Sequence, residues 1–411
     1  MSAVAETLRL DPEIELLVPE RDVPDPVLSI VIPALDEALT IQDFVAWCHE
    51  GLREAGVPGE ILIIDSSTDA TPQLALAAGA RVLRTPRRGL GRAYMDAIPY
   101  IRGEWIVMGD ADCTYDFRSL RPFVERFQAG DEYVMGSRWK GSIQPGAMPR
   151  LHQYFGTPVT TWILNRLYSS EFSDIHCGMR GITKDALIRM DLQSQSWEYA
   201  SEMVLKSVHM HARTSEVPVR FLKDRDGRVS HHKRMGWFSP WQAAWINLRA
   251  MFVHGSEFFV FKPGLVLLAL GLLLTLPLAG GPIEIGPVTL SLYVAMLGLV
   301  LTTIGLTSVL LGAVAQVLFD YTGEARRRWS RLLPYTRTVL VAGGLCCVGV
   351  VMVVPLVHLW LTNDFKLDDP SAPINHLAVV GLTAMLSGFM LFACTLLLHG
   401  AMLATRTRDR P

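Results

Sequence analysis

Residues Leu28–Pro33 read LSIVIP, and the runs Glu60–Asp65 (EILIID) and Glu104–Gly109 (EWIVMG) have the same character. Short continuous runs rich in Ile and Val are typical of strands that are buried on both faces of a sheet. Apolar residues at helical spacing predict helices between and after these runs, over Thr40–Ala55, Thr71–Ala78 and Gly91–Ile101. The sequence therefore predicts an α/β domain built on a doubly wound parallel sheet.

Acidic side chains follow all three predicted strands, at the edge where a parallel sheet binds its ligands. They are Asp36 and Glu37, Asp65 and Asp69, and Asp110 and Asp112. Asp69 precedes a predicted helix, so a capping role explains it equally well. Asp110 and Asp112 are spaced i, i+2 and direct hard oxygen ligands toward one space, which suits Mg²⁺ or Mn²⁺ bound together with substrate phosphates. The sequence therefore predicts a metal and diphosphate site at these two residues.

A basic turn precedes the third predicted helix. Pro86–Arg92 reads PRRGLGR and contains Gly89 and Gly91. Backbone N–H groups and the helix dipole favour an anion at such a position. An exposed basic turn without a ligand is the alternative interpretation.

The composition of the 411-residue chain excludes some classes of protein. A net charge of -2 excludes a globally basic nucleic-acid binder, so no nucleic acid is expected as a partner. The six cysteines form no CxxC pair or zinc-ligand spacing and are interpreted as reduced structural thiols. Met1–Pro26 is acidic and rich in proline, unlike a signal peptide, which predicts that the first domain stays in the cytosol.

The C-terminal part of the chain consists of long apolar segments. About 20 helical residues cross a bilayer, and four segments are candidates: Pro263–Ala279, Val288–Leu318, Thr338–Leu361 and His376–Ala404. The spans contain almost no ionisable side chains, which disfavours an ion or proton pathway. Arginines concentrate in the loop between the second and third spans and in the C-terminal tail: Arg326, Arg327, Arg328, Arg331, Arg337, Arg406, Arg408 and Arg410. This asymmetry predicts a multi-pass protein of the plasma (cytoplasmic) membrane, with the first domain and both termini in the cytosol.

Aromatic residues are dense just before the first span. Among Arg249, His254 and Lys262, the chain places Trp237, Phe238, Trp241, Trp245, Phe252, Phe258 and Phe259. Aromatic rings and basic side chains both favour the headgroup layer, which predicts one or two interfacial helices in contact with membrane lipid. A buried linker between domain and membrane is the alternative.

Six segments resemble the family 2 glycosyltransferases, in particular the polyprenyl-phosphate (dolichol-phosphate) mannose and glucose synthases. They read IVIPALDE, IIDSSTDAT, RRGLGRAY, GDADCTYDF, VMGSR and DIHCGMRGITKDAL, and the resemblance covers about Leu28–Ser230. It implies a GT-A (Rossmann-like) domain that moves one glucose or mannose from UDP-glucose or GDP-mannose to polyprenyl phosphate. It also implies a C-terminal membrane bundle. The expected partition is a flexible segment 1–26, a GT-A catalytic domain 27–235, interfacial amphipathic helices 236–262, a four-span domain 263–405 and a cytosolic tail 406–411.

The resemblance also implies roles for individual residues. The nucleotide would contact Pro33, Asp36, Glu37, Asp65, Gly89, Gly91 and Asp110. The metal would bind Asp110 and Asp112, the catalytic group would comprise Asp112, Arg138 and Arg180, and the acceptor phosphate would meet Arg138, Arg225 and Arg228. The sequence departs from the family pattern where Asp36 replaces the Asn of PxxNE and where Thr114 replaces a Gln after the DxD motif. The basic motif is blurred to DRDGRVSHHK, so that His231 and Lys233 compete with the two arginines.

A polyprenyl phosphate is already an anion at neutral pH, so the transfer would need positioning rather than a general base, and direct displacement predicts inversion at the sugar. Two other functions stay open. A processive polysaccharide synthase should carry QxxRW in its soluble domain, whereas Arg326–Trp329 (RRRW) lies between spans and lacks the Gln. A non-catalytic membrane subunit or lipid translocator would not need Asp110 and Asp112. Whether the protein forms a homo-oligomer is also left open.

Overall fold

The chain divides into two compact units, 1–251 and 252–411, each considered by itself. The structure is a computed structural model and describes residues 11–149, 152–168, 170–196, 198–225, 255–320, 323–366, 369 and 371–406. Most of the predicted interfacial segment 236–262 lies outside these residues. Its described end, η3 (Glu257–Phe261), runs directly into the first apolar helix. The finer partition at residues 26, 235, 262 and 405 stays a prediction.

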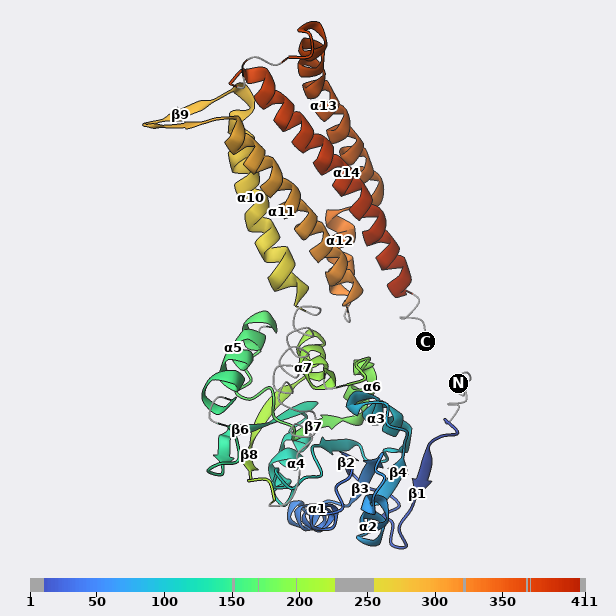
Figure 1. Cartoon of the computed structure of the whole chain (residues 1–411). Coiled ribbons are helices and arrows are strands. Elements are labelled where there is room, and N and C mark those ends of the chain that lie inside the picture. Colours follow the sequence, from blue (N-terminus) through green and yellow to red (C-terminus); the bar gives the residue numbers. More distant parts are fainter. Residues whose placement is uncertain are drawn as a thin grey trace. The chain divides into compact units, whose positions relative to one another are not determined.

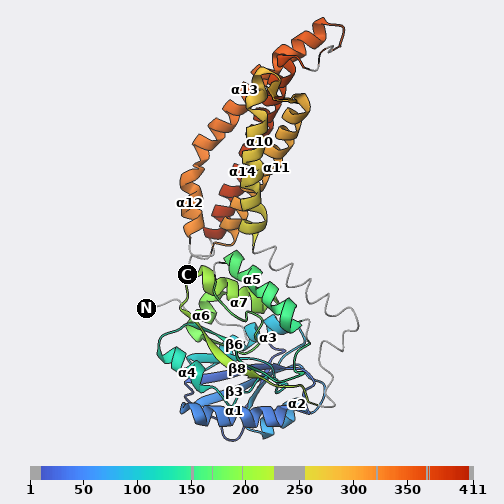
Figure 2. The same ribbon diagram turned by 90° about the vertical axis from the view of Figure 1, so that its left-hand side faces the viewer.

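An eight-stranded mixed sheet forms the centre of the first unit (Figures 1 and 2), in the order β1-β4-β3-β2-β5-β7-β6-β8. The four neighbours β4, β3, β2 and β5 are parallel to one another. The strands are β1 (Glu15–Leu17), β2 (Leu28–Ala34), β3 (Gly59–Asp65), β4 (Arg81–Arg84), β5 (Trp105–Met108), β6 (Tyr133–Ile143), β7 (Arg180–Thr183) and β8 (Thr214–Phe221). The chain adds β3 and β4 on one side of β2 and then β5 on the other, so the direction of winding reverses between β2 and β5.

The prediction of a parallel sheet is right for these four strands and wrong for two others. β1 is antiparallel to β4, and β7 is antiparallel to both β5 and β6. These strands have three and four residues, so they give no long apolar run that periodicity could detect. Because β7 runs against β5, the chain enters β7 at the sheet edge where β5 ends.

Helices cover both faces of the sheet (Figures 1 and 2), α1, α2 and α4 on one face and α3, α6 and α7 on the other. β2 is buried between them, and Ile30, Val31 and Ile32 have no exposed surface. Full burial of one such side chain contributes about 1.5–3 kcal/mol. The helices are α1 (Ile41–Ala55), α2 (Thr71–Ala77), α3 (Leu90–Ala97), α4 (Arg121–Gln128), α5 (Thr157–Tyr168), α6 (Lys184–Met190) and α7 (Tyr199–His209), with η1 (Ile98–Tyr100) and η2 (His152–Gly156).

The second unit contains four helices that are long and apolar enough to cross a membrane. The candidate spans are Glu257–Gly280, Leu292–Leu318, Tyr335–Thr362 and Pro373–Ala404. Their helices are α10 (Lys262–Thr275), α11 (Leu292–Leu318), α13 (Tyr335–Thr362) and α14 (Pro373–Arg406); η4 (Pro277–Gly280) follows α10, and α12 (Glu324–Leu332) links α11 to α13. The predicted start of the second span at Val288 is wrong, because Val288–Leu290 forms β10 of a hairpin with β9 (Ile283–Ile285). Alternating apolar residues in this short stretch are compatible with either structure.

Glycines bring α10 and α11 into close contact. A Cβ added to Gly305 would lie 2.2 Å from the backbone nitrogen of Leu268, and one added to Gly271 would lie 2.3 Å from that of Thr302. Gly349 and Gly381 approach each other in the same way on α13 and α14. Small residues of this kind let membrane helices pack backbone against backbone.

Glu60 connects three parts of the first unit at the start of β3. Its carboxylate accepts hydrogen bonds from Ser29 Oγ at 2.6 Å, Arg81 Nη1 at 2.6 Å and Arg102 Nε at 2.8 Å. Burial alone would raise the pKa of Glu60, but the hydrogen bonds from Ser29, Arg102 and Arg81 outweigh it and lower the pKa below its ordinary value. The ionised carboxylate therefore stabilises the fold.

Glu60→Gln is expected to lower the free energy of unfolding by about 1–3 kcal/mol at neutral pH, because buried donors lose their charged acceptor. A pKa that is lower in the folded state means that the contribution is complete above the ordinary pKa, near 4.5, and is lost as the pH falls through the folded value. Chemical denaturation of the purified full chain should thus show that the free energies of unfolding of the unchanged protein and of Glu60→Gln become equal at acidic pH. An unchanged difference between them at all pH values would contradict this account.

Candidate functional site

Asp110 and Asp112 lie where β5 ends, beside the point at which the winding of the sheet reverses. Open α/β sheets bind ligands at such a reversal, beyond the carboxyl ends of the strands. Both side chains are half-buried. The structure places Asp36 and Glu37 just after the adjacent β2, and Asp65 at the end of β3, at the same edge. The predicted grouping of three acidic strand ends is therefore present.

Gly178, in the loop that enters β7, forms part of the surroundings of Asp110. A Cβ on Gly178 would lie 2.7 Å from Asp110 Oδ2 and 3.0 Å from the ring of Tyr115. The Gly178 N–H donates a hydrogen bond of 2.8 Å to the Tyr115 hydroxyl, which holds the loop in place. The glycine thus leaves room for the carboxylate. Its role was missed in the sequence, although it lies in the DIHCGMR segment.

The backbone directly after the DxD motif, Asp110–Asp112, is strained. Cys113 has a φ of 59°, in the left-handed region that residues other than glycine rarely adopt. This conformation lets Asp112 Oδ1 accept hydrogen bonds from Thr114 N at 2.9 Å and Thr114 Oγ1 at 2.6 Å. Thr114 therefore orients the Asp112 carboxylate. Strain of this kind is concentrated at functional sites.

The donor set fits a magnesium- or manganese-type ion. The described part of the chain contains no group of three His, Cys, Asp or Glu residues arranged to hold a metal. Asp110 and Asp112 supply hard oxygen ligands from two carboxylates, and Mg²⁺ commonly binds to one or two carboxylates and completes its shell with water and substrate phosphates. A metal here would thus depend on a phosphate-bearing substrate.

Asp36 and Asp65 shape the edge next to Asp110. Asp36 has a φ of 56°, and its Oδ1 accepts a hydrogen bond from Thr68 N at 3.1 Å, so it fixes the loop after β3. Asp65 is fully buried and forms an ion pair with Arg84. Burial raises the pKa of Asp65. Its Oδ1 is buried without a hydrogen-bond partner within the described chain, which suits a donor from a ligand. Pro33 lies inside β2, and Glu37, the residue after Asp36, is buried.

Gly89 and Gly91 have a packing role. A Cβ on Gly89 would lie 2.3 Å from the carbonyl oxygen of Gln195, and one on Gly91 would lie 2.0 Å from that of Ser194. These contacts alone require glycine at both positions. The contact of these glycines with a diphosphate stays a prediction.

Arg138 is paired with a residue that the sequence analysis did not single out. Its Nε and Nη2 donate to the two oxygens of Asp174 at 2.6 and 2.7 Å, and both side chains are buried. The guanidinium also lies over the Phe221 ring, 5.3 Å from its centroid. The predicted contact with the acceptor phosphate therefore competes with a bidentate ion pair.

Arg180 and Arg225 differ in their surroundings. Arg180 is buried and donates to the carbonyl oxygens of Ala200 at 3.0 Å and Cys177 at 2.7 Å. Arg225 forms an ion pair of 2.5 Å with Asp43 on α1. Burial raises the pKa of the Cys113 thiol, next to Asp112, to about 12. Arg228 lies outside the described residues.

Gly178→Ala is expected to reduce catalytic turnover by about 100-fold with little loss of stability, because the added methyl group displaces the Asp110 carboxylate by a fraction of an ångström to an ångström. Gly146→Ala is the control: it lies in the same β6–β7 connection, its Cβ would meet nothing within 4 Å, and its φ of 81° makes the change cost about 1 kcal/mol of stability without touching Asp110. Turnover and unfolding should be measured on both full-length variants. Equal turnover in the two would contradict the proposed contact.

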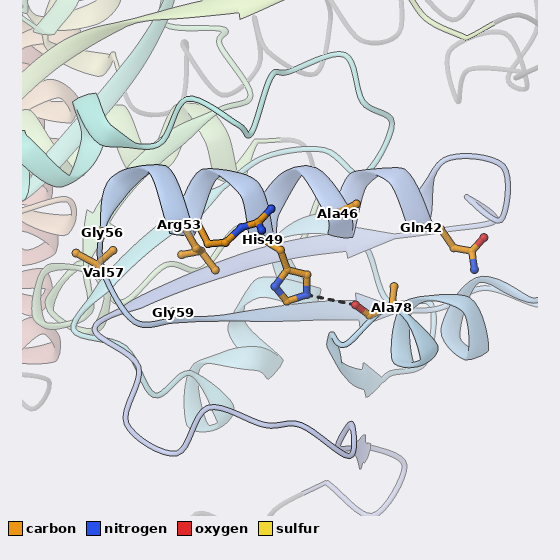
Figure 3. Close-up of a pocket in the computed structure, with 9 residues that line it drawn as sticks. Gln42, Ala46, His49, Arg53, Gly56, Val57, Gly59 and Ala78 are labelled. Atoms are coloured by element: carbon orange, nitrogen blue, oxygen red, sulfur yellow. Dashed lines mark hydrogen bonds between the residues drawn. The ribbon is translucent and has the colours of Figure 1, made fainter.

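A surface pocket of about 680 Å³ lies elsewhere on the first unit (Figure 3). His49 on α1 lines it and makes a contact of 3.2 Å with the Ala78 carbonyl oxygen. Gly59, another lining residue, is the first residue of β3, whereas the acidic edge follows the last residue, Asp65. The pocket is thus at the amino end of the strand and shares no residue with the candidate site.

Comparison with known proteins agrees with this architecture. Residues 29–190 match Glycosyl transferase family 2, and residues 313–401 match the Glycosyltransferase family 2 C-terminal transmembrane region. The low-salt glycan biosynthesis hexosyltransferase Agl6 of Haloferax volcanii is 33% identical over 380 residues, which cover 90% of this chain and 88% of the relative. The chain belongs to glycosyltransferase family 2. It combines a GT-A domain with the apolar helices of a multi-pass membrane protein.

Two further proteins share part of the chain. A dolichyl-phosphate hexose transferase of Haloferax volcanii is 27% identical over 172 residues, which cover 41% of this chain and 72% of the relative. The crystal structure of glucosyl-3-phosphoglycerate synthase from Mycobacterium tuberculosis with Mn²⁺, UDP and glucosyl-3-phosphoglycerate gives a TM-score of 0.41 at 19% identity. That comparison covers 55% of this chain and 80% of the other.

Proposed function

We propose that this protein transfers a single hexose, glucose or mannose, from UDP-glucose or GDP-mannose to polyprenyl phosphate at the cytosolic face of the membrane. The observation that carries the proposal is the pair Asp110 and Asp112 at the end of β5. At this point the winding direction of the sheet reverses, and Gly178 lies against Asp110. Membership of glycosyltransferase family 2 limits the chemistry to glycosyl transfer.

The ends of β2 and β3, next to Asp110, support the proposal that the sugar donor is a nucleotide-sugar. The unpartnered Oδ1 of Asp65 is buried and can accept a hydrogen bond from an N–H of a nucleobase. Asp36 holds the neighbouring loop through Thr68, so this part of the site is already ordered. Asp110 and Asp112 would hold Mg²⁺ or Mn²⁺ with the diphosphate.

Three properties support a lipid-linked acceptor. Four helices of the second unit are long and apolar enough to span a bilayer. Arginines follow the second of these helices on α12, which supports a cytosolic position for that loop and therefore for the catalytic unit. A Haloferax volcanii relative that matches 41% of this chain is a dolichyl-phosphate hexose transferase. A phosphate anchored at the headgroup plane is most accessible to an enzyme that is held in the same membrane.

The mechanism follows from charge and position. A polyprenyl phosphate oxygen is already anionic at neutral pH, so this chain needs no general base to activate it. Asp36 and Asp65 would orient the nucleotide, and Thr114 holds Asp112 through its hydrogen bonds. When bound, a divalent metal supplies positive charge that stabilises the leaving diphosphate. Arg138, Arg180 and Arg225 are the basic candidates for the phosphates, and direct displacement gives inversion at the anomeric carbon.

The test is transfer to lipid in membranes that contain the full-length protein. Membranes are incubated with polyprenyl phosphate and radiolabelled UDP-glucose, GDP-mannose or another sugar nucleotide, with Mg²⁺ or Mn²⁺ or with EDTA, and labelled lipid is quantified. One donor should dominate, EDTA should abolish transfer, and the product should have inverted configuration. A labelled polymer would indicate a processive synthase instead, and absence of labelled lipid with every donor would overturn the proposal.

A further inference from the structure

The helix α5 and the preceding turn η2 present their largest apolar side chains outward. Tyr154 is 73% exposed, Phe155 63% and Trp162 67%, and Val159 between them is 37% exposed. Soluble proteins rarely gather so many large apolar side chains in one exposed patch without a binding partner. These four residues are called the aromatic ridge below.

The opposite face of α5 is small and partly polar. Thr157 and Thr161 are 7% and 6% exposed, and Leu164 is 2% exposed where it joins the core of the first unit. The helix therefore buries two threonines and one leucine, packs a partly buried Ile163 against the same core, and exposes its tryptophan. A helix of a soluble domain usually turns its largest apolar side chain toward the core instead. Burial within the unit does not explain the ridge, so its residues are suited to an apolar surface outside it.

The charge of the surrounding sequence is one-sided. Between Glu132 and Glu171 the chain contains no aspartate or glutamate, and it contains Arg138, Lys140, Arg150 and Arg166. Two of these are already paired, Arg138 with Asp174 and Lys140 with Glu216. The segment as a whole lacks the acidic residues that would repel an anionic surface. Tryptophan, tyrosine and basic residues together characterise the headgroup region of a bilayer.

We propose that the aromatic ridge docks the catalytic unit on the lipid bilayer, with Trp162 and Phe155 inserted among the headgroups. The occupant is the bilayer rather than a protein, because the segment combines exposed aromatic rings with a lack of acidic residues, and because the same chain carries membrane-spanning helices. Because the chain continues from the first unit into the membrane spans, the bilayer is present at a high effective concentration, and a small exposed patch is enough for docking. The inference concerns the position of the unit and does not depend on the donor or acceptor of the proposed reaction.

Photocrosslinking of the full-length protein tests this docking. p-Benzoylphenylalanine is placed at position 162, at position 155 as a second probe, and at Ala46 on α1 as the control, since Ala46 is exposed and carries no neighbouring aromatic ridge. Each protein is reconstituted in nanodiscs of phosphatidylcholine and phosphatidylglycerol, irradiated without substrate and analysed by mass spectrometry. We expect about tenfold more lipid adduct at 162 and 155 than at 46.

Other occupants give different adducts. Crosslinks from 162 and 155 to another segment of the same chain, or to a second copy, in place of lipid would overturn the proposal. Equal lipid labelling at all three positions would overturn it as well. Because Trp162 and Phe155 are exposed, the probes should leave the fold intact, and an unchanged melting temperature of each variant checks this directly. Loss of sugar transfer in the preceding assay would leave this result unaffected.

Discussion

Asp112→Asn is expected to reduce sugar transfer by about 1000-fold or more, with insertion into the membrane and the melting temperature unchanged. The substitution keeps the shape and the acceptor oxygen that Thr114 contacts, but it removes the negative charge that a divalent cation requires. The measurement is initial transfer to polyprenyl phosphate over a range of Mg²⁺ and Mn²⁺ concentrations. Raising the metal concentration should restore little activity.

Asp69→Asn is the matched control for this prediction. Asp69 also follows a strand of the acidic edge, but it is exposed, and its Oδ1 accepts hydrogen bonds from Thr71 N at 2.9 Å and Thr71 Oγ1 at 2.5 Å, which fix the turn before α2. It should retain nearly full transfer. If Asp69→Asn and Asp112→Asn lost activity equally, the metal assignment would lose its support, and retained activity in Asp112→Asn would refute it.

Asp174→Ala is expected to lower the free energy of unfolding by about 3–5 kcal/mol, because it leaves the buried guanidinium of Arg138 without its bidentate partner. Chemical denaturation of the purified full chain measures the change. Glu54→Ala is the control. Glu54 pairs with Arg121 at 4.0 Å, and both side chains are more than half exposed, so the loss should stay below about 1 kcal/mol.

A double variant separates the two roles of Arg138. Replacing the pair together, as Arg138→Met with Asp174→Leu, removes both buried charges and should recover much of the stability that Asp174→Ala loses. If Arg138 also contacts a substrate phosphate, the double variant stays inactive although it is folded. Recovery of both stability and transfer would mean that the arginine serves the fold alone.

The central strands and the acidic edge could be predicted because their signals are local. A run such as LSIVIP at Leu28–Pro33 is buried as a unit, and an acidic residue directly after it must lie at the carboxyl edge. The direction of β7 could not be predicted, since four residues, RGIT, fit either orientation. The pairing of Arg138 with Asp174 was missed for a different reason. It joins residues 36 positions apart, and only the fold brings them together.

Among the site residues too, some could be predicted from local sequence signals and others depend on the fold. Asp110 and Asp112 could be selected from the sequence because they follow a predicted buried strand at the i, i+2 spacing that suits a metal, and their metal binding stays a prediction. Gly178 could not, because a glycine required by a neighbouring carboxylate resembles any loop glycine. Gly89 and Gly91 matched an anion-binding pattern, yet the carbonyl groups of Ser194 and Gln195 also exclude a side chain there. A glycine motif in a sequence thus indicates that another group lies very close to the backbone, but it does not identify that group.

The antiparallel direction of β7 has a consequence for how such proteins diversify. Since β6 runs parallel to β5 and β7 runs against both, the chain leaves the sheet after β6 and returns to it before β7 at the same edge. The connection between them carries α5, Asp174 and Gly178 as one contiguous stretch. Both ends of this stretch are therefore fixed at one edge of the sheet, and Asp174 ties it to Arg138 of β6. Related chains can differ within this excursion, and in the surface that it places beside Asp110, while β5, β6 and β7 keep their register.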